Sequence, residues 1–201
     1  MAEISVAAEV AEKLSTLPEA SAVTMRLKSD QYFDAIQGML DRFATKKDLE
    51  VVYVTSTIPS QSILSALEAL EIPMEHIWFV DCISQIMMTQ AKRHLHSIAV
   101  ESPTMLENIM LKVEYLLRKH EDRKALVVLD SINSLAIHNN TKILSEFLHI
   151  LVNNLRSRGA YTVIFSMQEY ETEEIRNMLV LVSDETIELG GLRTSASVRA
   201  P

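Results

Sequence analysis

The sequence predicts an α/β domain with three layers, in which helices cover both faces of a mostly parallel sheet. Short segments rich in Val, Ile and Leu alternate along the chain with segments whose apolar residues recur at helical spacing. The strand-like segments lack the polar alternation of a half-exposed strand, which indicates that both of their faces are buried. Buried strands separated by helices favour parallel pairing through right-handed crossovers. Any ligand is then expected at the carboxyl ends of the strands.

The strands are predicted from short apolar runs bounded by polar or turn-forming residues. The run "KALVVLDS" is the clearest buried strand, and "HSIAV" is the weakest because the stretch from Cys82 to Glu101 has no clear periodicity. The expected strands cover residues 21–27, 50–56, 76–81, 96–100, 124–131, 161–168 and 185–189.

The helices are predicted from apolar stripes and from residues that start or stop a helix. Ser29 or Asp30 can cap the helix that follows the first strand. Proline at the first helical position sacrifices no hydrogen bond, so Ser102 and Pro103 are expected to begin a helix. Gly159 is expected to end one. We expect helices over residues 5–15, 60–70 and 171–182, and others that begin near residues 30, 102 and 141.

Length and composition favour one globular domain with a short segment at each end. The chain has 201 residues, of which 48% are hydrophobic and 23% charged, and only 4 glycines and 5 prolines leave little room for linkers. Residues 1–19 are predicted to form an N-terminal helical segment, residues 20–189 the α/β domain, and residues 190–201 a flexible tail.

The charge balance argues against several classes of partner. The formal net charge is −8, whereas nucleic acids and anionic membranes attract clustered Lys and Arg. The single Cys82 excludes an internal disulfide, and the N-terminus "MAEISVAAEVAEKL" carries acids where a secretion signal would carry Lys or Arg. The longest apolar runs are far shorter than the roughly 20 residues that span a bilayer. We therefore expect a cytoplasmic protein that binds neither membranes nor nucleic acid.

Three segments resemble RecA/KaiC-like P-loop ATPases. "KALVVLDSINSL" is similar to the Walker B strand of that family, and the strand ending at Gln168 is similar to the segment in which a polar residue senses the nucleotide. Upstream, "VVYVTSTIPSQSILSALEALEIPMEHIWFVD" resembles the KaiC-type order of strand, turn with proline, helix and strand ending in aspartate. The resemblance covers residues 20–189 and implies a three-layer RecA/KaiC-like fold.

The sequence departs from that family at two positions that carry its chemistry. The family has a G-x-x-x-x-G-K-[ST] loop after its first strand, in which glycines let backbone amides wrap the phosphates. This sequence has "MRLKSDQY", which contains no glycine and adds the acidic Asp30. KaiC-like enzymes also place acidic residues where this sequence has "TSTI" at 55–58. The resemblance therefore implies a degenerate member without the means for phosphoryl transfer.

Four residues are weak candidates for cofactor binding: Lys28, Asp130, Ser131 and Gln168. Lys28 is either a solvated turn residue or a vestigial phosphate contact. Asp130 either binds Mg²⁺ or caps a helix with the help of Ser131 and Asn133. Gln168 either senses nucleotide or pairs with backbone groups. We expect no catalytic residues, no metal and no cofactor, with ATP and Mg²⁺ as the alternative.

Three further groups have weaker functional interpretations. His94 and His96 would share one face of a strand and could contribute to a metal site, although the sequence indicates no further ligands. Cys82 is more typical of a small core residue than of a nucleophile. Four methionines are either core filler or an adaptable surface for a partner: Met87, Met88, Met105 and Met110.

The sequence thus predicts a non-catalytic RecA/KaiC-like domain that acts in protein–protein interaction or regulation, without ATP hydrolysis. The expected partner is another protein or a second copy of the chain, and an intact RecA/KaiC-like ATPase is one candidate. The alternative is a nucleotide-binding sensor or ATPase with a non-standard phosphate site formed by Lys28, Asp130 and Gln168.

Overall fold

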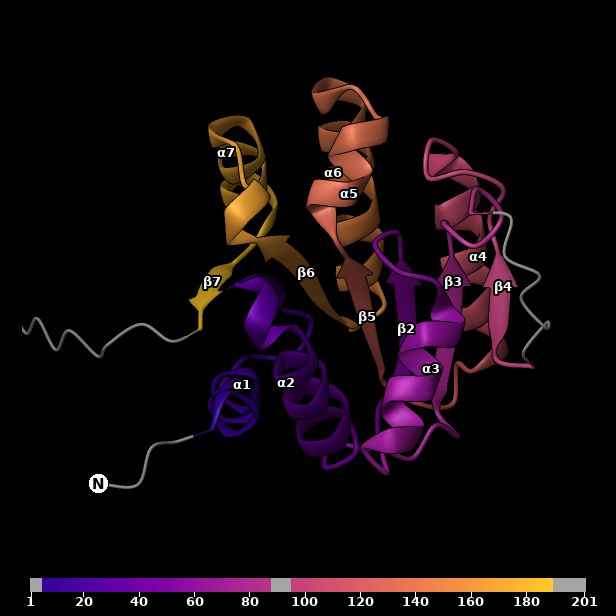
Figure 1. Cartoon of the computed structure of the whole chain (residues 1–201), viewed down its shortest axis with the longest axis vertical. Coiled ribbons are helices and arrows are strands. Elements are labelled where there is room, and N and C mark those ends of the chain that lie inside the picture. The colour runs from indigo at the N-terminus through magenta and orange to yellow at the C-terminus, as the bar shows by residue number, and fades with distance from the viewer. Residues whose placement is uncertain (1–4, 88–94, 190–201) are drawn as a thin grey trace, which may run out of the picture.

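The described residues, 5–87 and 95–189 of the computed structural model, form a single seven-stranded sheet (Figure 1). Its strands are β1 (Ala22–Leu27), β2 (Glu50–Thr55), β3 (Ile77–Asp81), β4 (Ser97–Ala99), β5 (Ala125–Asp130), β6 (Tyr161–Met167) and β7 (Glu185–Glu188). Their order is β4-β3-β2-β5-β6-β1-β7, and every neighbouring pair is parallel. The predicted parallel α/β sheet is confirmed.

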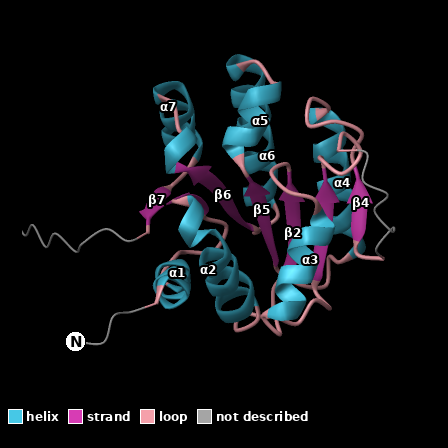
Figure 2. Ribbon diagram, in the orientation of Figure 1, coloured by secondary structure: helices cyan, strands magenta, loops and turns pink. Residues whose placement is uncertain are grey.

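Helices cover both faces of this sheet (Figure 2). The α-helices are α1 (Val6–Ser15), α2 (Tyr32–Gln37), α3 (Ser60–Ala69), α4 (Leu106–Lys119), α5 (Ile132–His138), α6 (Thr141–Ser157) and α7 (Glu173–Val182). A π-helical segment, Gly38–Ala44, continues α2. Helices α1, α2 and α3 lie on one face, and α4, α5, α6 and α7 lie on the other (Figure 1).

Alternate residues of the central strands build two separate cores. In β2, Val51 and Tyr53 point to the core beneath α1, α2 and α3, whereas Val52 and Val54 point to the core beneath the other helices. Both faces are therefore apolar, which explains the continuous hydrophobic runs in the sequence. The helices of residues 5–87 and 95–189 include none that combines the length and apolar character needed to cross a bilayer.

Gly38 allows α1 to pack unusually close to α2 and the π-helical segment. A Cβ atom at this position would lie 2.9 Å from Cβ of Val10 and closer still to the carbonyl oxygen of Ala7. Ala7, Val10 and Leu14 are buried on the inner face of α1. The missing side chain therefore lets the first helix join the same core as β1.

The element boundaries differ from the predicted ones in two places. Helix α4 begins at Leu106 rather than at Ser102, because the Ser102 hydroxyl accepts a hydrogen bond from the Thr104 amide and closes a turn first. The short helix α5 was not predicted, since seven residues show too little periodicity to separate from a loop. The predicted stop at Gly159 is confirmed: α6 ends just before it, and its φ is +71°.

Candidate functional site

Backbone amides of the loop after β1 donate hydrogen bonds to side-chain oxygens of the protein. Lys28 is exposed, and its N–H donates to Oε1 of Gln31 at 2.9 Å. The N–H of Ser29 donates to Oε1 of Glu169 at 2.9 Å. This backbone hydrogen bond lowers the pKa of Glu169, and the Lys28 ammonium adds a smaller effect in the same direction. The Glu169 carboxylate, in the connection between β6 and α7, therefore accepts from a loop amide that could otherwise bind an anion.

Asp130, at the end of β5, is fully buried and is surrounded by hydroxyl donors. Tyr53 donates to its Oδ2 at 2.7 Å, Tyr32 donates to the same oxygen, and Thr57 donates to Oδ1 at 3.1 Å. Burial raises the pKa of Asp130, against the lowering effect of these hydrogen bonds. Both carboxylate oxygens thus have protein partners.

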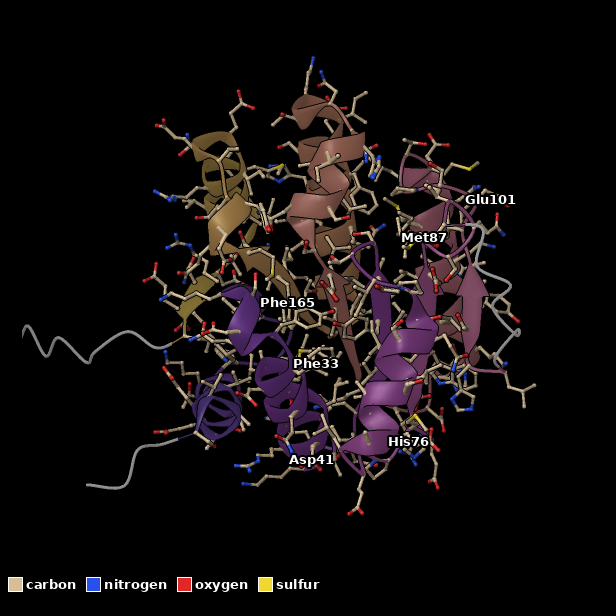
Figure 3. All side chains as sticks on the ribbon, viewed as in Figure 1. Phe33, Asp41, His76, Met87, Glu101 and Phe165 are labelled. Carbon is tan, nitrogen blue, oxygen red and sulfur yellow. The ribbon has the colours of Figure 1, made fainter. Side chains whose placement is uncertain are left out.

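Tyr32 connects the loop after β1 with Asp130. It is the first residue of α2 and packs edge-on against Phe33 and against Phe165 of β6, with its ring centroid 5.0 Å and 6.2 Å from theirs. Figure 3 labels these two phenylalanines. Burial, and then the Asp130 charge, raise the pKa of Tyr32, so its hydroxyl keeps its proton. The aromatic ring of Tyr32 thus lies between Asp130 and the loop that contains Lys28.

Ser131 and Gln168 have structural partners. The Ser131 hydroxyl caps α5 by accepting from the Ser134 amide at 3.4 Å, and its oxygen lies 3.2 Å from the Thr57 hydroxyl oxygen. Gln168 donates to the carbonyl oxygen of Arg26 at 3.4 Å. The Thr57 hydroxyl therefore lies against both Asp130 and its neighbour Ser131. Within residues 5–87 and 95–189, no hydrogen bond joins Lys28 or Gln168 to Asp130.

Arg26, at the end of β1, is engaged by two carboxylates. Its guanidinium contacts Glu171 at 2.7 Å and also pairs with Glu188. The Glu171 side chain is 1% exposed and accepts further bonds from Ser166 at 2.9 Å and Arg176 at 3.2 Å. Burial opposes its charge, but the hydrogen bonds from Arg26 and Ser166 outweigh burial and lower the pKa of Glu171. The charge of Arg26 is thus paired with two carboxylates of the protein itself.

Asp81, at the end of β3, is held in the same way. Its carboxylate accepts from the amides of Ser60 and Ser84 at 2.7 and 2.8 Å and from the Ser84 hydroxyl at 2.6 Å. Burial opposes the charged form, yet the Ser60 and Ser84 hydrogen bonds lower the pKa of Asp81 overall. Both strand-end aspartates, Asp81 and Asp130, are therefore satisfied by the protein itself.

Negative charge predominates in four of the connections at this edge of the sheet, among the described residues. The connections that follow β1, β4, β5 and β6, with the first turns of their helices, have seven exposed carboxylates and three exposed permanent cations. The acids are Asp30, Asp34, Glu101, Glu107, Glu169, Glu173 and Glu174, and the cations are Lys28, Lys142 and Arg176. Such an edge repels polyphosphates.

The weaker candidates do not come together in one site. His96 lies near the amino end of the sheet, where its ring stacks on Trp78 at 4.3 Å and its Nδ1 is 3.1 Å from the carbonyl oxygen of Ile77. His94 and Met88 lie outside the described residues. Cys82 is buried, and burial raises its pKa. In the described part of the chain, no group of three or more His, Cys, Asp or Glu residues is arranged for a metal ion.

Tyr32, Tyr53, Thr57 and Glu169 are the site residues that sequence analysis missed. Tyr53 offered a signal, because a tyrosine in a strand buried on both faces needs a hydrogen-bond partner for its hydroxyl. Its position two residues before the end of β2 places it beside the end of β5, where Asp130 needs donors. Glu169 offered no local signal, since its partner Ser29 is 140 residues away in the chain.

Comparisons with known proteins agree with this architecture. The KaiC-like protein PH0186 of the hyperthermophilic archaeon Pyrococcus horikoshii OT3 has a similar structure, with a TM-score of 0.59 and 16% identity, over 86% of this chain and 72% of that chain. At this identity the likeness concerns the fold. No curated protein matches the sequence. The family model for the KaiC ATPase matches residues 40–199, from a point that follows the Lys28 loop. Because this match spans most of the sequence, the chain belongs to the KaiC ATPase family.

Proposed function

We propose that this chain is a non-catalytic member of its family, which acts through protein–protein interaction or regulation and does not hydrolyse ATP. The observation that carries the proposal is the enclosure of Asp130 by Tyr32, Tyr53 and Thr57. An aspartate must offer an oxygen to hold Mg²⁺. Here both oxygens accept hydroxyl protons, and the residue is 0% exposed.

The loop after β1 supports the same proposal. Phosphate-binding loops present free backbone amides, often from glycines that adopt positive φ. Residues 26–31 contain no glycine, and the amides of Lys28 and Ser29 bond to Gln31 and Glu169. A triphosphate would have to displace Glu169 and approach an acidic edge, which gives an unfavourable electrostatic balance.

Loss of phosphoryl transfer leaves the surfaces of the domain available for binding. Phosphoryl transfer depends on positioning and charge stabilisation of the transferred group. A domain that lacks both can still present a rigid three-layer scaffold to another protein. The proposed partner is a protein or a second copy of the chain, and an intact ATPase of the same family is one candidate.

Purified protein tests the proposal by phosphate release and by calorimetry with ATP, ADP and Mg²⁺. We expect no phosphate release above a protein-free blank and no heat of nucleotide binding. Folded Asp130→Asn and Lys28→Ala should show the same absence of phosphate release and of nucleotide-binding heat as the parent protein, as should the exposed control Lys142→Ala. ATP hydrolysis that disappears in Asp130→Asn or Lys28→Ala, but persists in Lys142→Ala, would instead establish a non-standard phosphate site.

A further inference from the structure

Two imidazole rings and an ammonium group lie against the indole of Trp78, at the end of the sheet where the strands begin. The rings of His96 and His120 both stack on the indole, with their centroids 4.3 Å and 4.4 Å from its own. The Lys119 ammonium nitrogen lies 5.0 Å from the centroid of the same ring. Because Trp78 belongs to β3, His96 directly precedes β4 and His120 follows α4, the stack joins two strands to a helix end.

Glu50 connects this stack to β2. It is the first residue of that strand, its side chain is 5% exposed, and its carboxylate accepts a hydrogen bond from the indole N–H of Trp78. Its Oε1 is 3.4 Å from Nδ1 of His120, and its Oε2 is 3.2 Å from Nδ1 of His76. His76, labelled in Figure 3, comes from the connection before β3. We refer to six side chains as the tryptophan cluster: Glu50, His76, Trp78, His96, Lys119 and His120.

The contacts of the three imidazoles determine which nitrogen carries the proton in each neutral ring. Nδ1 of His76 and Nδ1 of His120 each face a carboxylate oxygen of Glu50. Nδ1 of His96 is 3.1 Å from the carbonyl oxygen of Ile77. Carboxylate and carbonyl oxygens only accept hydrogen bonds, so Nδ1 is the donor in all three rings. A second proton must therefore enter at Nε2.

The surroundings of His120 do not accommodate a second N–H. Its Nε2 is buried and has no hydrogen-bond partner among the described residues. A proton added there would leave a buried donor without an acceptor, which is unfavourable. The resulting charge would also lie near the Lys119 ammonium, since both groups contact the Trp78 ring. His76 differs, because its side chain is 45% exposed and water can reach it.

Acid would give the tryptophan cluster more positive charge than Glu50 balances. Imidazole gains its proton between about pH 8 and about pH 5, so the three histidines and Lys119 would place four cations around one carboxylate. His76 would compete with His120 for Glu50, and its Nδ1 lies at the shorter distance. The charge of a protonated His120 would therefore be poorly compensated.

Other charged groups at this end of the sheet do not offset the surplus. Arg123 pairs with Asp48, and Lys124 pairs with Glu19. The remaining acids of the connections before β3 and β5 are exposed, so water and salt screen their charges: Glu71, Glu75, Glu121 and Asp122. Residues 88–94, outside the described part of the chain, contain no Asp or Glu.

We propose that the tryptophan cluster is a pH-sensitive switch, in which protonated His120 leaves the Trp78 ring and releases the last turn of α4 from β3. With neutral imidazoles, the stack and the contact with Glu50 hold this helix end against the sheet. The attraction of a cation to an indole face opposes release, but Lys119 already lies over that ring. His120 is the C-cap residue of α4, so its departure exposes the helix end to water.

Trp78 is the only tryptophan in the chain, so tryptophan fluorescence reports on the tryptophan cluster alone. We expect its emission maximum to move to longer wavelength between about pH 7.5 and about pH 5.5, while far-UV circular dichroism stays constant. Over the same range, amide hydrogen exchange in the last turn of α4, corrected for the intrinsic effect of pH, should accelerate by roughly threefold or more. Both measurements use the unaltered protein and do not depend on the folding of a variant.

A matched pair of variants assigns the effect to one histidine. His120→Asn removes the group that titrates and keeps an amide N–H near the position of Nδ1, so its emission maximum should no longer depend on pH in this range. His149→Asn is the control, since His149 is exposed on α6, and its emission should follow that of the parent protein. Circular dichroism at the neutral end of the range verifies that both variants are folded.

Three results would overturn the proposal. They are an emission maximum that stays in place, an unchanged exchange rate in the last turn of α4, and a shift in His120→Asn equal to that of the parent protein. A loss of fluorescence intensity without a shift would also overturn it, because a charged imidazole that quenches Trp78 would then remain stacked. A shift that coincides with loss of circular dichroism would assign the change to global unfolding and would equally overturn it.

Discussion

The hydroxyl of Tyr53 on β2 donates a 2.7 Å hydrogen bond to Oδ2 of Asp130 on the adjacent β5, and both side chains are fully buried. A carboxylate removed from water needs donors in the protein to remain charged. Tyr32 donates to the same oxygen from α2, on the face of the sheet to which Tyr53 points. Through Asp130, the two tyrosines therefore join β2 and β5 to the covering helix α2. This is the position at which the family resemblance places a metal-binding acid.

Tyr53→Phe should lower the free energy of unfolding by about 1–3 kcal/mol, because it removes one donor from a buried carboxylate and leaves the shape of the side chain nearly unchanged. Urea unfolding followed by circular dichroism measures the change. Tyr115→Phe is the matched control, since Tyr115 is 56% exposed on α4, and its effect should stay within about 0.5 kcal/mol. Equal effects of the two substitutions would contradict the role given to Tyr53.

Acidification should destabilise the fold through Glu171. The pKa of this carboxyl is lowered in the folded protein, where Arg26 and Ser166 outweigh the effect of burial. Its stabilising effect is therefore present above the usual glutamate pKa of about 4.3 and is lost as pH falls through the lower folded value. In urea unfolding between pH 7 and pH 3, Glu171→Gln should show a shallower loss of stability at the acid end. The same slope in both proteins would rule out this contribution.

Gly38→Ala should destabilise the fold even though alanine favours helices by about 1 kcal/mol over glycine. The new methyl group would overlap the backbone of Ala7 and press on Val10, so we expect a net loss of about 1–3 kcal/mol. Gly159→Ala isolates the cost of backbone conformation from the cost of steric overlap. The added Cβ would have no neighbour within 4 Å, but the residue has a φ of +71°, which favours glycine. Its loss should be about 1 kcal/mol. Thermal unfolding compares the two, and a larger loss at Gly159 would contradict the packing argument.

Local patterns in the sequence predicted the sheet because its central strands are apolar on both faces. Strands such as Ala125–Asp130 have no polar alternation, and this composition alone indicates helices on both sides of the sheet. Helix α5 was missed because its start depends on the Ser131 side chain, a single hydrogen bond that serves equally well in a loop. The start of α4 was misplaced because Ser102 closes a turn with Thr104.

The candidate site was harder to predict, since its contacts join distant parts of the chain. Asp130, Ser131 and Gln168 were identified as strand-end residues, and the fold places all three there. What surrounds Asp130 could not be predicted, because Tyr32 is 98 residues away and Tyr53 is 77 residues away in sequence. Only the strand order β2-β5-β6-β1 brings them together. The enclosure of the carboxylate is thus a property of topology rather than of any motif.

Asp130→Asn and Tyr53→Phe should show non-additive effects on stability, because they act on the two ends of one hydrogen bond. Each single substitution should destabilise the fold, the first by altering the acceptor and the second by removing a donor. Once Asp130 has lost its charge, the missing Tyr53 hydroxyl matters less. The double variant should therefore lose less stability than the sum of the singles, by about 0.5–3 kcal/mol.

The control cycle pairs Asp130→Asn with Tyr115→Phe. The hydroxyls that bond to Asp130 within the described residues are those of Tyr32, Tyr53 and Thr57, whereas Tyr115 is exposed on α4. This cycle should be additive within about 0.5 kcal/mol. Additivity in the Tyr53 cycle as well would mean that the tyrosine hydroxyl does not stabilise the aspartate charge. The enclosure of Asp130 would then lose its energetic basis, and a carboxylate able to leave its hydroxyl partners would again be available to a metal ion.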